Sequence, residues 1–247
     1  MKVKKHIFHT LFALNIMVLV LPGLVSCSKT DTATPTSSDI QLQVMNLSPD
    51  SYPLGLYQNN LRITGTNYSF GNTPSYFYLT STAYPLQLRV QRSDTVLVFN
   101  NDSLQFKNNT RYSLFFIGLY SEKLLKPLIT IDDTASLPPI GKGGKLRFVN
   151  GSPRAKGLDI WANGSRIIEN TDVGKVSNYV TLPTGNYSFR VYSTGTSTNS
   201  LTNLDRVTIQ DGRLYTIYTR GIIGRTAADT AAFGLVVVPN NPPKINR

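Results

Sequence analysis

The sequence predicts an all-β protein made of two tandem immunoglobulin-like antiparallel β-sandwiches. Short β-branched and aromatic runs, separated by Asn, Gly, Pro and Asp, recur from Ile40 onward, and no segment keeps a helical period. An internal repeat divides this β region into two copies. Each copy has about 95 residues and about seven strands, which is the size of an immunoglobulin-like sandwich.

The repeat consists of short motifs that keep their order. Val44-Met45-Asn46-Leu47-Ser48-Pro49 matches Phe148-Val149-Asn150-Gly151-Ser152-Pro153, and residues 54–60 match 158–164 at the same offset. Further along, 62–63 matches 166–167, 86–90 matches 187–191 and 111–115 matches 214–218. Two unrelated β domains would share alternation but not Asn-x-Ser-Pro, so we interpret the repeat as a duplication.

Turn signals support strands within each copy. Asn163-Gly164 is typical of a type I′ hairpin, and Asn59-Asn60 stands at the matching place. Asn46 and Asn150 precede Ser and Pro, where an Asn side chain commonly shapes a turn. We expect these two asparagines to be structural, and a binding loop is the alternative.

The repeat and the composition set the domain boundaries. We expect a first module at 40–136, a Pro/Gly-rich linker at 137–144, a second module at 145–238 and a tail at 239–247. The linker should be stiff at its prolines and loose at its glycines. The adjacent acids Asp132 and Asp133 should lie in an exposed loop before it.

The N-terminus has the order of an export signal. Basic residues are followed by an apolar stretch that is too short to span a membrane and ends in Leu24-Val25-Ser26-Cys27. This ending is similar to the lipobox of bacterial lipoproteins, which implies that the signal peptide 1–26 is removed and that Cys27 carries a lipid. Residues 27–39 would then be a flexible tether. An ordinary secreted protein with one stray cysteine is the alternative.

Two predictions follow for the exported chain. Ser28, and not Asp, follows Cys27, which by analogy with Gram-negative lipoproteins favours the outer membrane, on its periplasmic or its surface-exposed face. Removal of the lysines before Cys27 leaves 22 basic and 14 acidic residues, a net charge of +8. The basic residues are scattered, so we expect a solvated surface and no nucleic-acid partner.

Residue usage argues against most catalytic chemistry. Both histidines, His6 and His9, precede Cys27, so the exported part has no histidine and no free thiol. It therefore lacks the groups of Ser-His-Asp and Cys-His mechanisms and the usual ligands for zinc. Its glutamates, Glu122 and Glu169, do not stand at matching positions. We expect no enzyme activity, no cofactor and no metal site.

The motifs resemble a known family. Modules that open with Asn-x-Ser-Pro, continue into a Leu-x-Ile/Leu-aromatic strand and end in a Tyr-x-Ile/Leu-aromatic strand are similar to the domain-of-unknown-function family DUF 4397. The resemblance covers most of 40–238 and implies exported or lipid-anchored β-sandwiches, often in pairs. The second module fits the family better, because it has the acidic residue Asp159 at a position where the first module has Gly55.

The candidate binding residues come from the matching strands 54–58 and 158–162. If Leu54, Leu56, Leu158 and Ile160 face the core, then Tyr57 and Trp161 face outward, where an aromatic ring can stack on a sugar or a peptide. Asp159 shares the side of Trp161 and could accept a hydrogen bond from a ligand hydroxyl. The alternative is that a loop or the other module covers these rings.

The predicted function is therefore non-catalytic binding of a glycan or a surface protein at the cell envelope. A structural or accessory subunit of an outer-membrane transport or adhesion assembly is the alternative, in which the modules would pair through edge strands or apolar patches.

Overall fold

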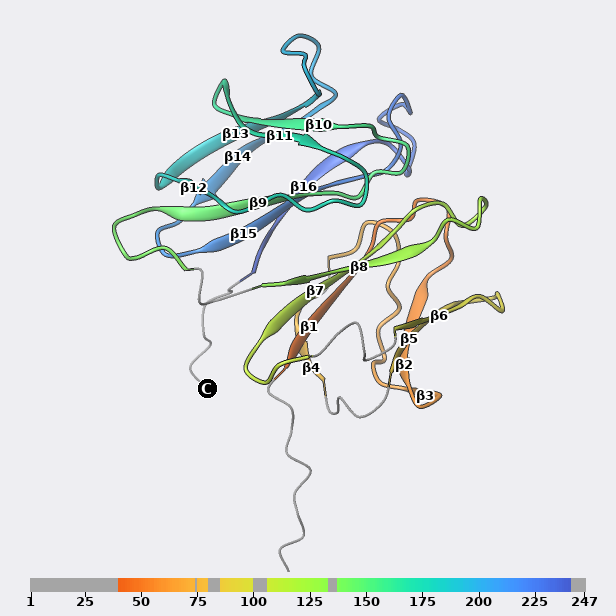
Figure 1. The fold of residues 1–247 in the computed structure, drawn as a ribbon. Coiled ribbons are helices and arrows are strands. Elements are labelled where there is room, and N and C mark those ends of the chain that lie inside the picture. Colours follow the sequence, from red (N-terminus) through yellow and green to blue (C-terminus); the bar gives the residue numbers. More distant parts are fainter. Residues whose placement is uncertain (1–39, 74, 80–84, 100–105, 133–136, 241–247) are drawn as a thin grey trace, which may run out of the picture. The chain divides into compact units, whose positions relative to one another are not determined.

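The computed structural model describes residues 40–73, 75–79, 85–99, 106–132 and 137–240. The predicted signal peptide, Cys27, the tether, Asp133 and most of the predicted tail lie outside these ranges. Within them every regular element is a β-strand (Figure 1). The all-β tandem prediction is confirmed.

Among the described residues, each module has eight strands. The first contains β1 (Gln41–Asn46), β2 (Leu54–Gln58), β3 (Leu61–Arg62), β4 (Phe77–Tyr78), β5 (Leu86–Val90), β6 (Val96–Phe99), β7 (Arg111–Ile117) and β8 (Lys126–Ile131). The second contains β9 (Gly144–Asn150), β10 (Leu158–Ala162), β11 (Ser165–Thr171), β12 (Val180–Leu182), β13 (Gly185–Ser193), β14 (Thr202–Ile209), β15 (Leu214–Arg220) and β16 (Gly234–Pro239). Gly144, which the sequence placed in the linker, opens β9.

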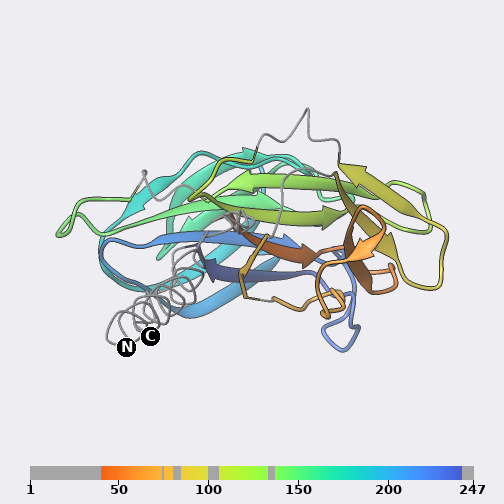
Figure 2. The same ribbon diagram turned by 90° about the horizontal axis from the view of Figure 1, so that it is seen from below.

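The two modules have the same topology. Sheet A has the order β4-β1-β7-β8 and sheet B the order β3-β2-β5-β6, and sheets C (β12-β9-β15-β16) and D (β11-β10-β13-β14) repeat these orders. One pair in each module, β1 with β7 and β9 with β15, is parallel, although the prediction was antiparallel throughout. Figure 2 shows the long strands of both modules from below. The shared topology supports duplication independently of the sequence motifs.

The predicted turns form as their residues require. Asn163 and Gly164 have φ of 48° and 84°, and Asn59 and Asn60 have φ of 45° and 63°. Positive φ at both central residues is the requirement of a type I′ turn, which Asn and Gly meet at low cost. Both hairpins are therefore confirmed.

The sequence match between 86–90 and 187–191 differs from the structural correspondence of these strands. In sheet B, Leu86 pairs with Gln58, whereas in sheet D the residue opposite Ala162 is Phe189. Leu86 thus corresponds to Phe189 and not to Tyr187, a shift of two residues. Side chains alternate with a period of two, so a shift by two keeps the core pattern and cannot be detected from it.

Each module has its own apolar core between its two sheets. In the first module the core includes Leu42, Leu56, Leu88 and Phe116, and in the second it includes Phe148, Ile160, Phe189 and Ile217. Strand β5 alternates between buried and half-buried residues, as a strand with one covered face should. Strands β7 and β15, by contrast, are buried along almost their whole length. They must be covered on both faces.

The second covered face is the contact between the two modules. A third apolar cluster joins Met45, Phe115 and Leu128 of the first module to Val149, Tyr218 and Val236 of the second. These residues are counterparts, because Phe115 pairs with Met45 and Leu128 just as Tyr218 pairs with Val149 and Val236. The rings of Phe115 and Tyr218 meet edge-to-face, with centroids 5.8 Å apart. The same strand position of each copy thus meets at the centre of the contact.

Glycines let the modules approach closely at the edge of this cluster. A Cβ at Gly71 would lie 2.1 Å from Nη1 of Arg220, and one at Gly174 would lie 2.9 Å from Cδ1 of Ile117. Gly71 N donates to the carbonyl of Asn46 and Gly174 N to the carbonyl of Asn150, so the two glycines are counterparts, and each of them touches the opposite module. The contact is therefore related by an approximate two-fold axis, as in an isologous dimer interface. The residues from Ser38 onward form one compact unit.

The repeated asparagines are structural, as expected. Asn150 is fully buried; its Oδ1 accepts hydrogen bonds from Ser152 N and Thr219 Oγ1, and its Nδ2 donates to the carbonyls of Ala155 and Thr171. Asn46 is also fully buried, and its Oδ1 accepts from Ser48 N.

Replacement of this asparagine tests its structural role. Asn150→Ala leaves several buried polar groups without partners, so we expect the free energy of unfolding to fall by about 2–3 kcal/mol. Urea denaturation followed by tryptophan fluorescence measures it. The control is Asn203→Ala, an exposed position where the change should stay within about 0.5 kcal/mol. Equal effects of the two substitutions would contradict the role assigned to Asn150.

Candidate binding surface

Strand β10 carries two of the predicted site residues, Asp159 and Trp161. Its central position in sheet D, between β11 and β13, holds both side chains in fixed register. Leu158 and Ile160 lie in the core, so the sheet face that carries Trp161 is the outer one, as predicted. The exposure of the two side chains differs, and this difference decides what each can do.

Asp159 is fully buried and already satisfied. Its carboxylate accepts hydrogen bonds from Asn170 N at 2.8 Å, Thr194 Oγ1 at 3.0 Å and Gly195 N at 3.4 Å, and it contacts Arg166 Nη1 at 3.4 Å. It therefore ties the irregular pairing of β10 and β11 to the turn after β13. The expectation that Asp159 faces a ligand is wrong, because the backbone and side chains of its own module use its oxygens.

Trp161 is half-buried on the outer face. Arg166 of β11 and Arg190 of β13 stand directly opposite it on the two neighbouring strands. Tyr192 meets the indole edge-to-face at 5.5 Å. Nε1 of Trp161 has no hydrogen-bond partner among the described residues. We call Trp161, Arg166, Arg190 and Tyr192 the Trp161 surface.

The arginines of the Trp161 surface lie beside acids. Arg166 contacts Glu169 at 3.2 Å as well as Asp159. A hydrogen bond from Ser188 lowers the pKa of Asp205, and the positive charge of Arg190 contributes to the same shift. Hydrogen-bond donors and acceptors thus surround an aromatic ring, an arrangement suited to a ligand with many hydroxyl groups.

Tyr57, the counterpart of Trp161 in the first module, is also half-buried, but an arginine side chain lies over its ring. Its ring folds over Gly55, where a Cβ would lie 2.8 Å from Cε2 of the tyrosine. The guanidinium of Arg89 lies 4.4 Å from the ring centroid, and Gln87 Oε1 accepts a hydrogen bond from it at 2.8 Å. The change from Asp159 to Gly55 gives the ring this space. Arg89 therefore occupies one face of the Tyr57 ring, and Tyr57 lies in a different sheet from Trp161.

Sequence reasoning missed the arginines of the Trp161 surface. The match of Arg62-Ile63 with Arg166-Ile167 was a usable signal for Arg166, since Arg62 and Arg166 stand opposite Tyr57 and Trp161 respectively. Arg190 had no such signal, because the match of 86–90 with 187–191 aligned it with Arg89, whereas its counterpart by strand register is Gln87. The residues of the Trp161 surface are neighbours because of the pairing register of β10, β11 and β13, which composition does not reveal.

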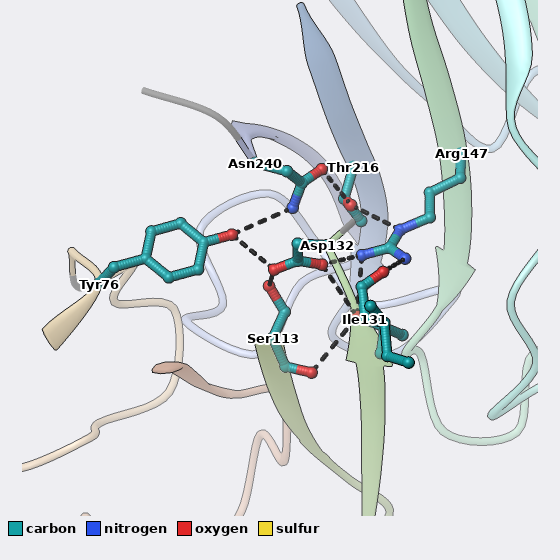
Figure 3. Close-up of polar contacts among 8 residues, drawn as sticks. Tyr76, Ser113, Ile131, Asp132, Arg147, Thr216 and Asn240 are labelled. Atoms are coloured by element: carbon teal, nitrogen blue, oxygen red, sulfur yellow. Dashed lines mark hydrogen bonds and ion pairs between the residues drawn. The ribbon is translucent and has the colours of Figure 1, made fainter. Parts of the chain in front are cut away.

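A second polar cluster is buried between the modules, around Asp132 (Figure 3). Tyr76 and Ser113 donate hydrogen bonds to Oδ2 of Asp132 at 2.5 and 2.6 Å, and Arg147 of β9 forms an ion pair with Oδ1. The prediction that Asp132 lies in an exposed loop is wrong. Asp132 is buried directly after β8, where Arg147 supplies a partner that the local sequence does not reveal.

Arg147 extends the cluster across the contact. Its guanidinium donates to the carbonyl of Ile131 at 2.8 Å and to Thr216 Oγ1 at 2.9 Å. Thr216 donates in turn to Asn240 Oδ1 at 2.7 Å, and Nδ2 of Asn240 reaches Tyr76 Oη at 3.3 Å. Burial is the largest influence on the pKa of Asp132 and raises it, while the charge of Arg147 works in the opposite direction. With no exposed member at its centre, this cluster joins the modules and offers no binding site.

Comparison with known proteins fits the repeat. The family model described as "Domain of unknown function (DUF4397)" matches residues 40–143 and again residues 144–246. The chain belongs to the DUF4397 family. No curated protein matches the sequence. The two matches meet at Gly144, where β9 begins.

The two DUF4397 modules differ at the connection between their last two strands. It runs over 118–125 in the first module and over the longer stretch 221–233 in the second. In the first module a groove of about 450 Å³ lies beside it, lined by Thr95, Leu97, Tyr120, Ser121, Lys123 and Leu125. The exposed side chains of Tyr52 and Leu124 belong to the same end of the module. The DUF4397 fold thus presents different surfaces in its two copies.

The described residues of the two DUF4397 modules do not bring together the ligands of a metal site. Among the described residues, no three His, Cys, Asp or Glu side chains are grouped so that they could hold an ion. A membrane-spanning helix is also absent from the part of the chain that the structure describes.

Proposed function

We propose that this protein is a non-catalytic glycan-binding protein of the cell envelope, exported and lipid-anchored through Cys27 to the outer membrane. The Trp161 surface is the proposed contact. The observation that carries the proposal is the position of Trp161 on an outer sheet face, with Arg166 and Arg190 directly opposite on both neighbouring strands. An indole can stack on the C–H face of a sugar, while guanidinium groups donate to its oxygens.

The test uses surface polysaccharide extracted from the producing bacterium as the probe in affinity electrophoresis. Trp161→Ala should weaken retardation by about 5–30-fold, equivalent to a loss of about 1–2 kcal/mol of binding energy. The matched control is Tyr57→Ala, at the counterpart position where Arg89 covers the ring, and it should leave retardation unchanged.

Folding must be separated from binding in this test. Arg190→Glu is an exposed change on the same surface that should weaken retardation without lowering the melting temperature. If Trp161→Ala and Tyr57→Ala behave alike, or if the wild-type protein is not retarded, the glycan proposal is rejected.

A second function, as an accessory subunit of an envelope assembly, is favoured by the groove beside Tyr120. Around it, Tyr52, Val96 and Leu124 are 46%, 44% and 60% exposed. Exposed apolar side chains at the rim of a groove are typical of protein–protein contacts. Cross-linking on intact cells separates the two functions, because a defined set of captured envelope proteins, lost on Leu124→Asp and kept on Trp161→Ala, would favour the assembly.

A further inference from the structure

The linker between the modules forms a hydrogen-bonded turn that presents an isoleucine to solvent. Lys142 N donates to the carbonyl of Pro139 at 3.0 Å, and Gly141 has φ of +83°, which is the geometry of a type II turn with Ile140 at its tip. The side chain of Ile140 is 92% exposed. Such an apolar residue at the tip of an ordered turn is unusual, because burial of apolar surface stabilises folding and exposure does not.

The turn is held in place from the second module. Asp211 accepts hydrogen bonds from Gly141 N at 2.6 Å and Gly143 N at 2.8 Å, and these bonds lower the pKa of its carboxyl. At Gly143 a Cβ would lie 2.1 Å from the carbonyl oxygen of Leu182, so the linker backbone lies directly against β12. Hydrogen bonds and a close backbone contact thus engage the linker glycines that the sequence predicted to be loose. The structure fixes the position of Ile140 although no contact of its side chain requires it.

Ile140 lies at the end of the molecule where the described chain begins and ends. Gln41 N donates to the carbonyl of Thr110, just before β7, and Asn240 N donates to the carbonyl of Leu214, the first residue of β15. Gly212 N donates to the carbonyl of Gly143, which joins the linker to the same end of β15. The two modules also contact each other at this end, as the hydrogen bond from Arg147 to the carbonyl of Ile131 shows. We call this end the base.

Three further exposed apolar residues belong to the base. Tyr78 pairs with Gln41 and is 62% exposed, and Ile131 pairs with Tyr112 and is 50% exposed. Leu137, at the start of the linker, is 38% exposed. With Ile140 they place exposed apolar side chains on both modules and on the segment between them.

Basic residues accompany these apolar side chains. They are Lys107, Arg111, Lys142, Lys145 and Arg213. Among the described residues of the base the carboxylates are already engaged, Asp211 by backbone amides and Asp132 by Arg147. Exposed apolar side chains mixed with Lys and Arg are typical of surfaces that lie on an anionic bilayer. The apolar side chains enter the headgroup region, and the Lys and Arg side chains bind the phosphate groups.

We propose that the base docks directly on an anionic phospholipid surface, with Ile140 as its inserting residue. The described part of the chain begins at the base, with 39 residues before it in the sequence, so the base is the end nearest in sequence to any N-terminal anchor. The proposal uses only residues of the folded part. It is therefore independent of the lipid on Cys27 and of the Trp161 surface.

The test measures sedimentation of residues 38–247, which form a compact unit with their own cores, with vesicles of phosphatidylcholine with and without phosphatidylglycerol. We expect binding to the phosphatidylglycerol vesicles that weakens with added salt, because salt screens the headgroup charges. Ile140→Asp and Lys142→Glu should each lower the partition coefficient at least about tenfold.

The matched control is Ile223→Asp, an exposed isoleucine at the opposite end, on the connection between β15 and β16, which should bind like wild type. Trp161→Ala should also keep vesicle binding, so failure of the glycan proposal would not be mistaken for failure of this one. Equal binding to both kinds of vesicle, or equal effects of Ile140→Asp and Ile223→Asp, would overturn the proposal. So would self-association in sedimentation equilibrium that Ile140→Asp abolishes, because a second copy would then cover the base.

Discussion

Asp132→Asn should lower the free energy of unfolding by about 3–5 kcal/mol, because it leaves the buried guanidinium of Arg147 without a charged partner. Arg147→Gln should have a cost of similar size, since it leaves the buried carboxylate of Asp132 with the hydroxyl groups of Tyr76, Ser113 and Thr130 but without a counter-charge. The side chains of Asp132 and Arg147 are 0% and 5% exposed, so water cannot replace either partner. Urea denaturation at neutral pH measures both changes.

The double substitution is the sharper experiment. By strand register, Asn240 is the counterpart of Asp132 and Gln43 is the counterpart of Arg147. The double variant Asp132→Asn with Arg147→Gln thus replaces the ion pair by Asn and Gln, the residue types found at the two-fold-related positions of the contact. We expect the double variant to lose less stability than the sum of the single losses, with an interaction energy of at least about 2 kcal/mol. Additive losses would show that the ion pair does not couple the two modules.

Gly221→Ala should lower the free energy of unfolding by about 3 kcal/mol. Gly221 has φ of +74°, and its Cβ would lie 2.1 Å from the carbonyl oxygen of Ala232, which is backbone and cannot rotate away. The left-handed conformation alone costs about 1–2 kcal/mol for an L-residue, and the displaced backbone adds to this. Gly118, its counterpart, meets the carbonyl oxygen of Leu124 at the same distance. Both modules therefore close the connection between their last two strands with a glycine.

Gly164→Ala is the control for this prediction. Gly164 has φ of +84°, but no atom lies within 4 Å of its Cβ position, so only the conformational cost of about 1 kcal/mol should appear. Thermal unfolding of the two variants side by side gives the comparison. Equal losses at Gly164 and Gly221 would mean that the close approach of the backbone contributes nothing.

The sequence contains a sign of the contact between the modules, but the search for alternating apolar residues did not detect it. Runs such as Leu114-Phe115-Phe116-Ile117 are apolar at every position, which is typical of strands buried on both faces. Such a run indicates that a second layer must cover the strand but does not say which one. Here the covering layer is the other copy, through Phe115 and Tyr218.

By itself the sequence determined the properties that depend on local pattern and on comparison of the chain with itself. These are the all-β class, the duplication, the type I′ turns at Asn59 and Asn163, the structural role of Asn150 and the family. Each follows from a short motif or a period of two, which neighbouring residues alone can express. The tertiary structure decided the burial of Asp132, the covering of Tyr57 by Arg89 and the placement of Arg190 beside Trp161. These depend on partners from distant strands, whose register and pairing no local pattern encodes.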